Sequence, residues 1–359
     1  MDNLSLILNE KNIAIIGGGL SGLTLAYLLE KQGYKITILE ASSRIGGRVH
    51  TVEGKLGTHL ELGATWFSDI HVKLVLLLKE LGLKKYLQYT KGTTIFQTKS
   101  FEPPQLFTIP DSEQPSFRIA GGTYSLIDAL KNNLKRTNIF LNTRATRISL
   151  MDDENVLVEA DELSLNCEKV IVCIPPQLVS SIQLPVQIPS ELYMLLPTVQ
   201  TWMAGSIKFV LEYESPFWRK NNFSGMLYSH TDIITEMYDH TNYEVNKFGF
   251  TGFLNSSANG ISLEKRMSNV LRHLSEFWGE EVFAPSAYFD KVWNDDLIVF
   301  NNQIIKMPHQ NNGHPLLQKA YLEEKLYFCG TETSSQYAGY MEGAIQAAMR
   351  VANRIKQAP

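Results

Sequence analysis

Residues 13–40 read IAIIGGGLSGLTLAYLLEKQGYKITILE, and this stretch decides the fold. It opens with a short, mostly β-branched apolar run at residues 13–16, which predicts a buried strand. Three glycines follow, and from Leu20 to Gln32 apolar residues recur at helical spacing until Gly33 ends the helix. Residues 35–40 alternate as a second strand. The stretch therefore predicts a strand–helix–strand unit of an α/β sheet.

The glycines after the first strand fit the spacing GxGxxG, which binds dinucleotides when it joins a strand to a helix. One glycine makes the tight turn, one admits a pyrophosphate to the backbone, and one lets the helix pack on the strand. Glu40 ends the second strand 18 residues after Gly22, close to the spacing of about 20 for an acid that binds ribose. NAD and FAD both remain open on this motif. The predicted phosphate-binding residues are Gly17, Gly19, Leu20, Ser21 and Gly22.

A second glycine pair follows Glu40 in the segment EASSRIGGRVH. Its glycines permit close approach of a ligand to the backbone, and the flanking Arg44 and Arg48 can offset the charge of a diphosphate. Taken alone, the segment could equally be an exposed basic turn. Its position directly after Glu40 favours a cofactor-binding role.

The composition excludes several classes of protein. The 359 residues are 44% hydrophobic and 19% charged, as in a globular chain of roughly two domains. A net charge of −4 argues against a surface built for nucleic acid. The sequence has no HExxH motif, no Cys/His cluster and no GxSxG elbow, so we expect no metal site and no serine hydrolase. Cys167, Cys173 and Cys329 form no CxxC pair and are predicted to be buried, reduced thiols on strands.

The sequence also bears on location. Residues 1–10 carry two acids and no basic start, which argues against a secretory signal. The longest purely apolar run, Leu74–Leu78, is far shorter than the ~20 residues that span a bilayer. We therefore expect a cytoplasmic protein without a membrane partner. The oligomeric state stays open.

The two ends of the chain differ from its middle. Both ends alternate strands and helices, whereas residues from Leu184 to about Phe289 hold extended, aromatic-rich segments and one clear helix. This pattern predicts an α/β fold: a Rossmann-like FAD-binding domain with an inserted mixed-sheet α+β substrate domain. The predicted boundaries are 1–67, 118–183 and 290–359 for the first domain, and 68–117 and 184–289 for the second.

Five ordered segments carry a resemblance to the flavin-containing amine oxidase family, the monoamine oxidase and polyamine oxidase group. Residues 13–51 resemble its N-terminal signature almost throughout, and ELGATWF (61–67) is similar to the segment that passes the isoalloxazine ring. IAGGTYSLIDAL (119–130) and VIVCIPPQL (170–178) are further matches. LYFCGTETSSQYAGYMEGAIQAA (326–348) is similar to the closing flavin-binding segment. The resemblance extends from about Lys11 to Arg354.

The resemblance implies an FAD site that runs along an extended groove. It places Glu40 on the adenosine ribose, Arg48 near the pyrophosphate, the backbone of Ala145 at the adenine, and Glu332 near the ribityl–pyrophosphate stretch. Met341, at the start of the last helix, would approach the flavin O2 edge, where a helix N-terminus stabilises negative charge. The implied FAD-binding residues are Gly17, Gly19, Leu20, Ser21, Gly22, Glu40, Ala41, Arg44, Gly47, Arg48, Gly63, Ala64, Thr65, Trp66, Ala145, Gly330, Glu332, Gly339, Tyr340 and Met341.

The same resemblance bears on whether FAD is linked covalently to the protein. Monoamine oxidases attach flavin through a cysteine that follows a tryptophan. Here Trp293 is followed by NDDLIVFNNQ, which contains no cysteine. We therefore expect non-covalent FAD.

Family members orient a neutral amine between aromatic rings. Tyr340 stands where one such tyrosine belongs, while the second position falls near Gln303, where no tyrosine lies. Trp66, Trp293 and Tyr337 could compensate, and the predicted catalytic residues are Tyr340, Trp293 and Trp66.

Many family oxidases also place a lysine beside the flavin N5. We expect that position within residues 249–258, which hold no lysine; Asn255, Ser256 and Ser257 lie there instead. Lys208 is expected on a strand surface.

These features predict an FAD-dependent oxidoreductase whose small-molecule substrate is an amine. The amine would give a hydride from its α-carbon to flavin N5, the imine would be hydrolysed, and the reduced flavin would pass electrons to O2 or another acceptor. Two alternatives remain: a related flavoprotein desaturase or oxidase of a non-amine substrate, and a low-turnover flavin-binding sensor or partner protein.

Overall fold

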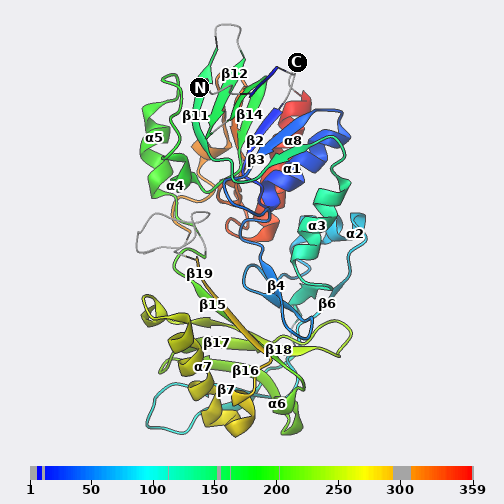
Figure 1. Ribbon diagram of the computed structural model, residues 1–359, viewed down its shortest axis with the longest axis vertical. Helices are drawn as coiled ribbons and strands as arrows, with labels where there is room; N and C mark the ends of the chain where they lie inside the picture. The colour runs from blue at the N-terminus through cyan, green and yellow to red at the C-terminus, as the bar shows by residue number, and fades with distance from the viewer. Residues whose placement is uncertain are drawn as a thin grey trace.

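Two large sheets stand one above the other in the computed structural model (Figure 1). The structure describes residues 6–9, 13–111, 113–151, 155–161, 163–201, 203–293 and 309–357. The upper part holds a six-stranded sheet with helices beside it, and the lower part holds a seven-stranded sheet. Long strands near residues 207–213 and 287–292 rise from the lower sheet toward the upper part.

The six-stranded sheet is the predicted α/β sheet. Its first five strands run parallel, and only the last pair is antiparallel. The two strands predicted around the glycine motif are buried along their whole length, as expected for central strands covered on both faces. The strand order is β10 (Asn138–Phe140), β3 (Ile36–Leu39), β2 (Ile13–Ile16), β14 (Lys169–Val172), β21 (Leu326–Phe328) and β20 (Ala320–Tyr321).

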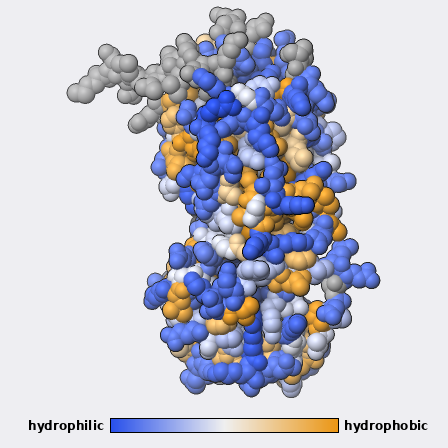
Figure 2. Space-filling view, turned by 90° about the vertical axis from the view of Figure 1, so that its right-hand side faces the viewer, coloured by the Kyte–Doolittle hydropathy of each residue, from blue (hydrophilic) through white to orange (hydrophobic). Residues whose placement is uncertain are grey.

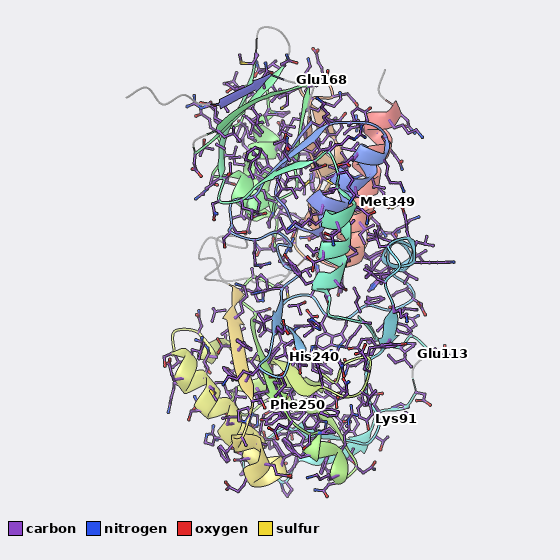
Figure 3. All side chains as sticks on the ribbon, turned by 45° about the vertical axis from the view of Figure 1, so that its right-hand side comes forward. Lys91, Glu113, Glu168, His240, Phe250 and Met349 are labelled. Carbon is purple, nitrogen blue, oxygen red and sulfur yellow. The ribbon has the colours of Figure 1, made fainter. Side chains whose placement is uncertain are left out.

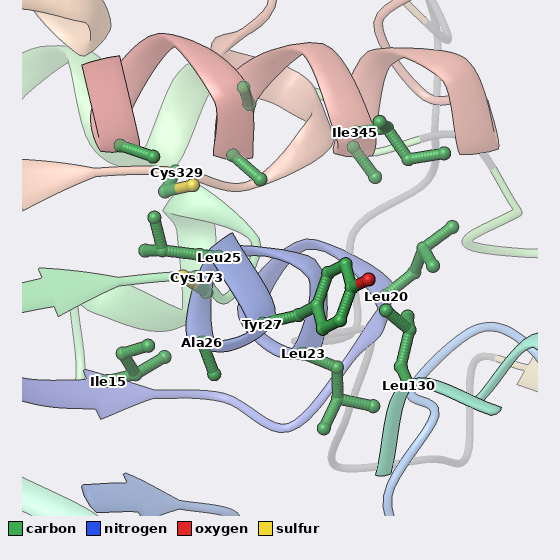
Figure 4. Packing of buried hydrophobic residues seen from close by; sticks show 14 of the residues in the cluster. Ile15, Leu20, Leu23, Leu25, Ala26, Tyr27, Leu130, Cys173, Cys329 and Ile345 are labelled. Carbon is green, nitrogen blue, oxygen red and sulfur yellow. The ribbon is translucent and has the colours of Figure 1, made fainter. Parts of the chain in front are cut away.

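Helices cover one face of this sheet. α1 (Leu20–Lys31) and α8 (Met341–Gln357) pack side by side on it, so the first and last segments of the chain share one core (Figure 4). In this core, Leu25 of α1 lies toward Cys329 and Cys173 (Figure 4). α2 (Val72–Glu80) and α3 (Tyr124–Asn133) complete this layer.

The other face carries a four-stranded sheet and two short helices. A second apolar cluster lies between this sheet and the six-stranded one. Cys167 ends a strand of this sheet, whereas Cys173 and Cys329 each lie one residue beyond a strand; all three thiols are buried and free. The elements are β1 (Leu6–Asn9), β13 (Leu163–Cys167), β12 (Val156–Ala160), β11 (Ala145–Leu150), α4 (Pro176–Val179) and α5 (Ser190–Leu195).

The seven-stranded sheet is mixed, as predicted for the middle of the chain. Only one pair in it, residues 223–229 with residues 93–97, is parallel. α7 (Leu263–Trp278) packs its apolar side on one face, and α6 (Phe217–Lys220) adjoins it. The strand order is β19 (Ala287–Val292), β15 (Ile207–Tyr213), β18 (Phe248–Leu254), β17 (Ile234–Asp239), β16 (Phe223–Ser229), β7 (Thr93–Gln97) and β8 (Gln105–Thr108).

Two small antiparallel pairs lie between the large sheets: β4 (Thr51–Glu53) with β5 (His59–Glu61), and β6 (Lys85–Leu87) with β9 (Phe117–Ile119). Leu60 and Leu62 pack against Val210 of β15, so the first pair covers the face of the lower sheet opposite α7. This contact buries β15 on both sides.

The surface over α2 is partly apolar. The helix buries Leu74, Leu77 and Leu78, while Val72 and Leu76 on its other side stay exposed. Figure 2 shows apolar residues on this face at mid-height. Among the described residues, no helix is long and apolar enough to cross a membrane.

Candidate active site

A cavity of about 490 Å³ lies at the carboxyl ends of β2, β3 and β14. Ligands of α/β proteins bind at this edge because the turns after parallel strands meet there. The cavity extends from the turn after β3 to the start of α8, as an elongated dinucleotide requires. It gathers many of the predicted cofactor residues: Gly17, Gly19, Leu20, Ser21, Glu40, Ala41, Gly47, Arg48, Ala64, Ala145, Gly339, Tyr340 and Met341.

Each glycine of the GxGxxG motif is suited to its position for a different steric reason. Gly17 has a φ of +109°, a conformation that side chains rarely adopt. A Cβ atom at Gly22 would overlap the carbonyl oxygen of Gly17 and lie 3.2 Å from Ile15 Cγ2, so only glycine lets α1 approach β2 this closely. A Cβ atom at Gly19 would meet only Gly47 Cα, at 3.9 Å, so that position is open toward the cavity. The turn therefore fits the backbone-lined cradle that a pyrophosphate needs.

Glu40 closes one end of the cavity. Its Oε2 accepts a hydrogen bond from the Gly18 N–H at 2.7 Å. Its Oε1 accepts from the Ser42 N–H at 2.9 Å and from Ser42 Oγ at 2.8 Å. The buried carboxylate thus connects the turns after β2 and β3 and lies at the cavity wall.

Arg48 is held at the wall by a carboxylate behind it. Its Nη1 lies 2.6 Å from Glu332 Oε1, and its Nη2 lies 3.2 Å from Glu332 Oε2. Glu332 has no exposed surface and also accepts from Thr201 Oγ1 at 3.2 Å. Glu332 therefore does not line the cavity in this structure but fixes the direction of the guanidinium that does.

Arg44 has a different place from the one predicted for it. Its guanidinium donates to the carbonyl oxygens of Ile45, Gly47 and Val49 at 2.7–3.2 Å. These bonds hold the turn at the second glycine pair, and Arg44 does not line the cavity. The arginine shapes the turn rather than facing a ligand.

The other end of the cavity lies at the start of α8. Thr331 Oγ1 accepts from the Gly339 N–H at 3.0 Å and donates to the Tyr340 carbonyl at 2.8 Å. Glu342, in the first turn, accepts from the N–H groups of Lys73 and Leu74 and so caps α2. The positive end of a 17-residue helix is thereby fixed at the cavity.

The expectation that Lys208 lies on a strand surface is wrong. Lys208 has no exposed surface, and its Nζ donates to the Gly63 carbonyl oxygen at 2.7 Å and to Thr65 Oγ1. Its Nζ also lies 4.9 Å from the ring centroid of Trp66. Residues 249–258 hold no lysine, as the sequence shows, and Lys208 lies instead against the segment that resembles the isoalloxazine-passing one.

Burial explains the chemistry of this lysine. Burial is the main cause that lowers the pKa of Lys208 to about 7; the attraction of Glu61 opposes this shift, and the positive charge of Arg118 adds to it. Burial raises the pKa of Glu61, whose carboxylate accepts from the Thr123 N–H at 2.6 Å and from Thr51 Oγ1 at 2.9 Å. Lys208 is thus poised between amine and ammonium near neutral pH.

His240 is buried in the lower part of the molecule (Figure 3). Burial lowers the pKa of His240, and the positive charges of Arg118 and Lys208 lower it further. Arg118 is itself buried, donates to the Thr241 carbonyl oxygen at 2.9 Å, and lies over the Tyr86 ring at 5.1 Å. The histidine is therefore neutral at physiological pH.

The three predicted catalytic aromatics have different surroundings. Tyr340 lines the cavity, is 43% exposed, and lies 5.9 Å from the ring of His71 and 6.3 Å from the nearly parallel ring of His309. Trp66 is half-buried and donates from Nε1 to Gln88 Oε1 at 2.8 Å. Trp293 has no exposed surface and donates to the Leu62 carbonyl at 2.9 Å, so the structure does not bring it to the cavity.

The remaining predicted residues lie behind the wall or outside the described chain. Gly22, Gly63, Thr65 and Gly330 do not line the cavity. Asn255 and Ser257 hydrogen-bond to each other in a turn, with Ser256 between them. The predicted second cage position near Gln303, and the cysteine-free segment after Trp293, lie outside the described residues. Among the described residues, no group of three or more His, Cys, Asp or Glu side chains could hold a metal ion.

The model of the family "flavin containing amine oxidoreductase" matches residues 20–103 and 96–356. The chain belongs to this family. The probable flavin-containing monoamine oxidase A of Dictyostelium discoideum is 23% identical, with 96% of this chain and 97% of that protein covered. The putrescine oxidase of Kocuria rosea is 23% identical, with 78% of this chain and 81% of that protein covered.

Solved structures agree on the fold. A putrescine oxidase bound to putrescine superposes with a TM-score of 0.84 at 19% identity, over 98% of this chain and all of that one. The cyclohexylamine oxidase of Brevibacterium oxydans gives a TM-score of 0.82 at 18% identity, over 97% of this chain and all of that one. The predicted α/β fold is confirmed.

Family membership makes this flavoprotein an FAD-dependent amine oxidoreductase, and the predicted enzyme class and cofactor are confirmed. The glycine cradle, the buried acid at one end and the helix N-terminus at the other fit an FAD molecule. The alignment with the Dictyostelium relative runs over 453 positions, more than the 359 residues of this chain, so the relative carries segments that this chain lacks.

Proposed function

We propose that the enzyme oxidises a small amine that enters as the neutral base, with O2 as the electron acceptor. The observation that carries this proposal is the buried Lys208, held against Gly63 and Thr65 with a pKa of about 7. Bound FAD would supply the acceptor for the hydride that leaves the α-carbon of the amine. The imine product would then be hydrolysed in water.

The roles at the cofactor follow the order of residues along the cavity. Glu40 would bind the adenosine ribose, and the Ala145 backbone would meet the adenine. Arg48, fixed by Glu332, would offset the pyrophosphate charge. The N-terminus of α8 at Met341 would stabilise negative charge on the O2 edge of the ring. FAD would be bound without a covalent link, and denaturation should release it into the supernatant.

On the substrate side, the proposed roles belong to aromatic side chains and to the side-chain amine of Lys208. Tyr340 and Trp66 would orient the substrate, and Trp293 would support the Gly63–Trp66 segment from behind through its bond to Leu62. Lys208 in its neutral form would hold a water molecule or accept a proton beside the ring system. The dry surroundings of Lys208 strengthen such a contact.

The domain boundaries stay part of this proposal. Residues 1–67, 118–183 and 290–359 would bind FAD, and residues 68–117 and 184–289 would form the substrate part. The two large sheets support this division, since one draws on residues 13–39, 138–172 and 320–328 and the other on residues 93–108 and 207–292. β19 ends at Val292 and so runs past the boundary at 290.

The decisive test is an anaerobic titration of the purified flavoprotein with amines, amino acids and polyamines. Bleaching of the flavin absorbance by an amine, and production of hydrogen peroxide after air is admitted, would support the proposal. A flavin that no amine reduces would refute it and favour a desaturase or a low-turnover flavin-binding protein. Reduction by an amine without peroxide would refute O2 as the acceptor.

A further inference from the structure

We propose that Cys173 and Cys329 form a redox-active thiol pair beneath the FAD cavity, which hydrogen peroxide oxidises to a disulfide in the FAD-free enzyme and which bound FAD shields. The inference goes beyond the proposed function and rests on it only for the source of the peroxide, which amine oxidation with O2 would release. It comes from two thiols on neighbouring strands, one of which reaches the cavity wall.

The strand register places the two cysteines opposite each other. β14 and β21 are parallel, and the last residues of their paired segment are Val172 and Phe328. Cys173 and Cys329 come next, and the Cys329 N–H continues the ladder by donating to the Val172 carbonyl oxygen at 2.8 Å. In a parallel pair this hydrogen bond puts Cys329 beside Cys173. Neighbouring strands lie about 4.8 Å apart, which is inside the range of about 4.4–6.8 Å between Cα atoms that a disulfide spans.

Both thiols lie on the same face of the sheet. Cys173 and Cys329 belong to the apolar core under α1 and α8. Val172 and Phe328, one residue earlier on each strand, belong to the core on the other face, because side chains alternate along a strand. Figure 4 shows both cysteine side chains near Leu25 of α1. The Cys173 thiol donates a hydrogen bond to Cys329 Sγ, so the two sulfur atoms are in contact in the reduced protein.

The surroundings of Cys329 favour its thiolate, which is the form that attacks peroxide. Burial raises the pKa of Cys329, whereas the hydrogen bond from Cys173 and the positive charge of Arg350 lower it. The Ser21 hydroxyl, 3.5 Å from Cys329 Sγ, lowers it further, and the resulting pKa lies below the usual value of a thiol. Burial raises the pKa of Cys173, which therefore keeps its proton.

The cavity gives peroxide a route to this pair. Cys173 lines the cavity, whereas Cys329 has no exposed surface and lies behind it. The backbone of Cys173 also adjoins the glycine turn, since a Cβ atom at Gly17 would lie 3.2 Å from the Cys173 carbonyl group. The thiols thus lie directly beneath the turn that fits a pyrophosphate. FAD bound there would cover Cys173 and close the route to Cys329.

The oxidation balances with one molecule of peroxide. The Cys329 thiolate attacks one peroxide oxygen, the O–O bond breaks, and hydroxide leaves a sulfenic acid on Cys329. That hydroxide takes the thiol proton of Cys173 and becomes water. The Cys173 thiolate then attacks the Cys329 sulfur and displaces a second hydroxide, which takes up the proton that Cys329 released on ionisation. Two thiols thus give two electrons to peroxide, and a thiol reductant reverses the change.

The test uses the full-length enzyme, one portion with added FAD and one portion stripped of flavin. Both are treated with hydrogen peroxide, the remaining thiols are alkylated under denaturing conditions, and the peptides are analysed by mass spectrometry. The stripped portion should yield one cross-link, between the peptides that contain Cys173 and Cys329, and dithiothreitol should remove it. With FAD at about 100 times its Kd only about 1% of the protein is free of FAD, so the rate of cross-linking should fall about 100-fold.

The third cysteine is the matched control. Cys167 lies in the core on the other face of the sheet and does not line the cavity, and burial raises its pKa to about 12. It should stay a free thiol throughout, and Cys167→Ala should leave the cross-link unchanged. Cys173→Ala and Cys329→Ala should each abolish the cross-link. The peptide map of the wild type decides the pairing whether or not these variants fold.

Three results would contradict the inference while leaving the proposed amine oxidation intact. They are a stripped enzyme without the cross-link between Cys173 and Cys329, a cross-link that includes Cys167, and equal rates with and without FAD. Because peroxide is added directly, the cross-link should form even in an enzyme whose flavin no amine reduces. That combination would refute the proposed function and support the thiol pair.

Discussion

Changing Gly22 to alanine should lower the stability of the protein, whereas changing Gly19, in the same motif, should weaken FAD binding. At Gly22 the added methyl would overlap the Gly17 carbonyl oxygen and press on Ile15 at 3.2 Å. Backbone atoms cannot rotate away, so α1 must lift from β2. At Gly19 the φ of −75° suits alanine, and the nearest atom to the new methyl is 3.9 Å away. That methyl would instead point into the space of the cofactor.

The magnitudes follow from these contacts. Overpacking against backbone costs up to about 3 kcal/mol, which should lower the melting temperature of the Gly22→Ala apoprotein by on the order of 5 °C. Gly19→Ala should leave that temperature within about 1 °C of the wild type, because a substitution without strain or clash changes stability little. It should nevertheless weaken FAD binding by about 100-fold, equivalent to about 2.7 kcal/mol.

The assay is calorimetry of both apoproteins, combined with fluorescence titration of each with FAD. The reasoning would be refuted if Gly22→Ala melted with the wild type, or if Gly19→Ala bound FAD with unchanged affinity. A Gly19→Ala protein that lost stability as well would show that the cradle is part of the folding core rather than an open wall.

The remaining predictions concern charge. Lys208 has a pKa of about 7 in the folded state and of about 10.4 in the unfolded state. Below pH 7 the folded protein therefore carries a buried positive charge, which lowers its stability. As the pH rises from 7 toward 10 the folded protein has lost this proton, and its stability increases. Lys208→Met should flatten the accompanying rise in melting temperature, and equal slopes in calorimetry of both proteins would contradict this. Glu332→Gln should leave Arg48 without its paired charge and weaken retention of FAD, measured as flavin released by ultrafiltration. Unchanged retention would show that Glu332 does not position Arg48 for FAD binding. Glu40→Gln should weaken binding of FAD by about tenfold but not that of FMN, which lacks the adenosine ribose, and a titration in which both flavins weaken equally would show a general loss of the turn.

The cofactor half was readable from the sequence because its signals are local. A strand, a glycine turn, a helix and an acid at fixed spacing occupy one continuous stretch. The contacts among these residues are therefore set by their spacing in the sequence and not by distant segments. The helix at residues 20–31 and the start of the last helix at Met341 lie where the pattern predicts them. Glu40 and Arg48 likewise line the predicted cavity.

The prediction that Lys208 lies on a strand surface was wrong because segments far away in the sequence bury it. Lys208 stands in the run IKFVLEY, where a lone lysine between apolar residues suggests a solvent-facing position. That strand lies between β19 and β18, and residues 60–66 cover its second face, so the lysine is buried by segments about 145 residues away in sequence. A lysine inside a mostly apolar strand was the available signal, since lysine is rarely buried without a function.

The sequence by itself determined that this chain builds an α/β dinucleotide site, because turn geometry and helix–strand packing depend on neighbouring residues. Only the tertiary structure decided which charges face that site and which stand behind it. Arg44 holds a turn, Glu332 directs Arg48, and Lys208 is buried against Gly63 and Thr65. These assignments depend on strand register and on what covers each face, and both are set by contacts between segments far apart in the chain.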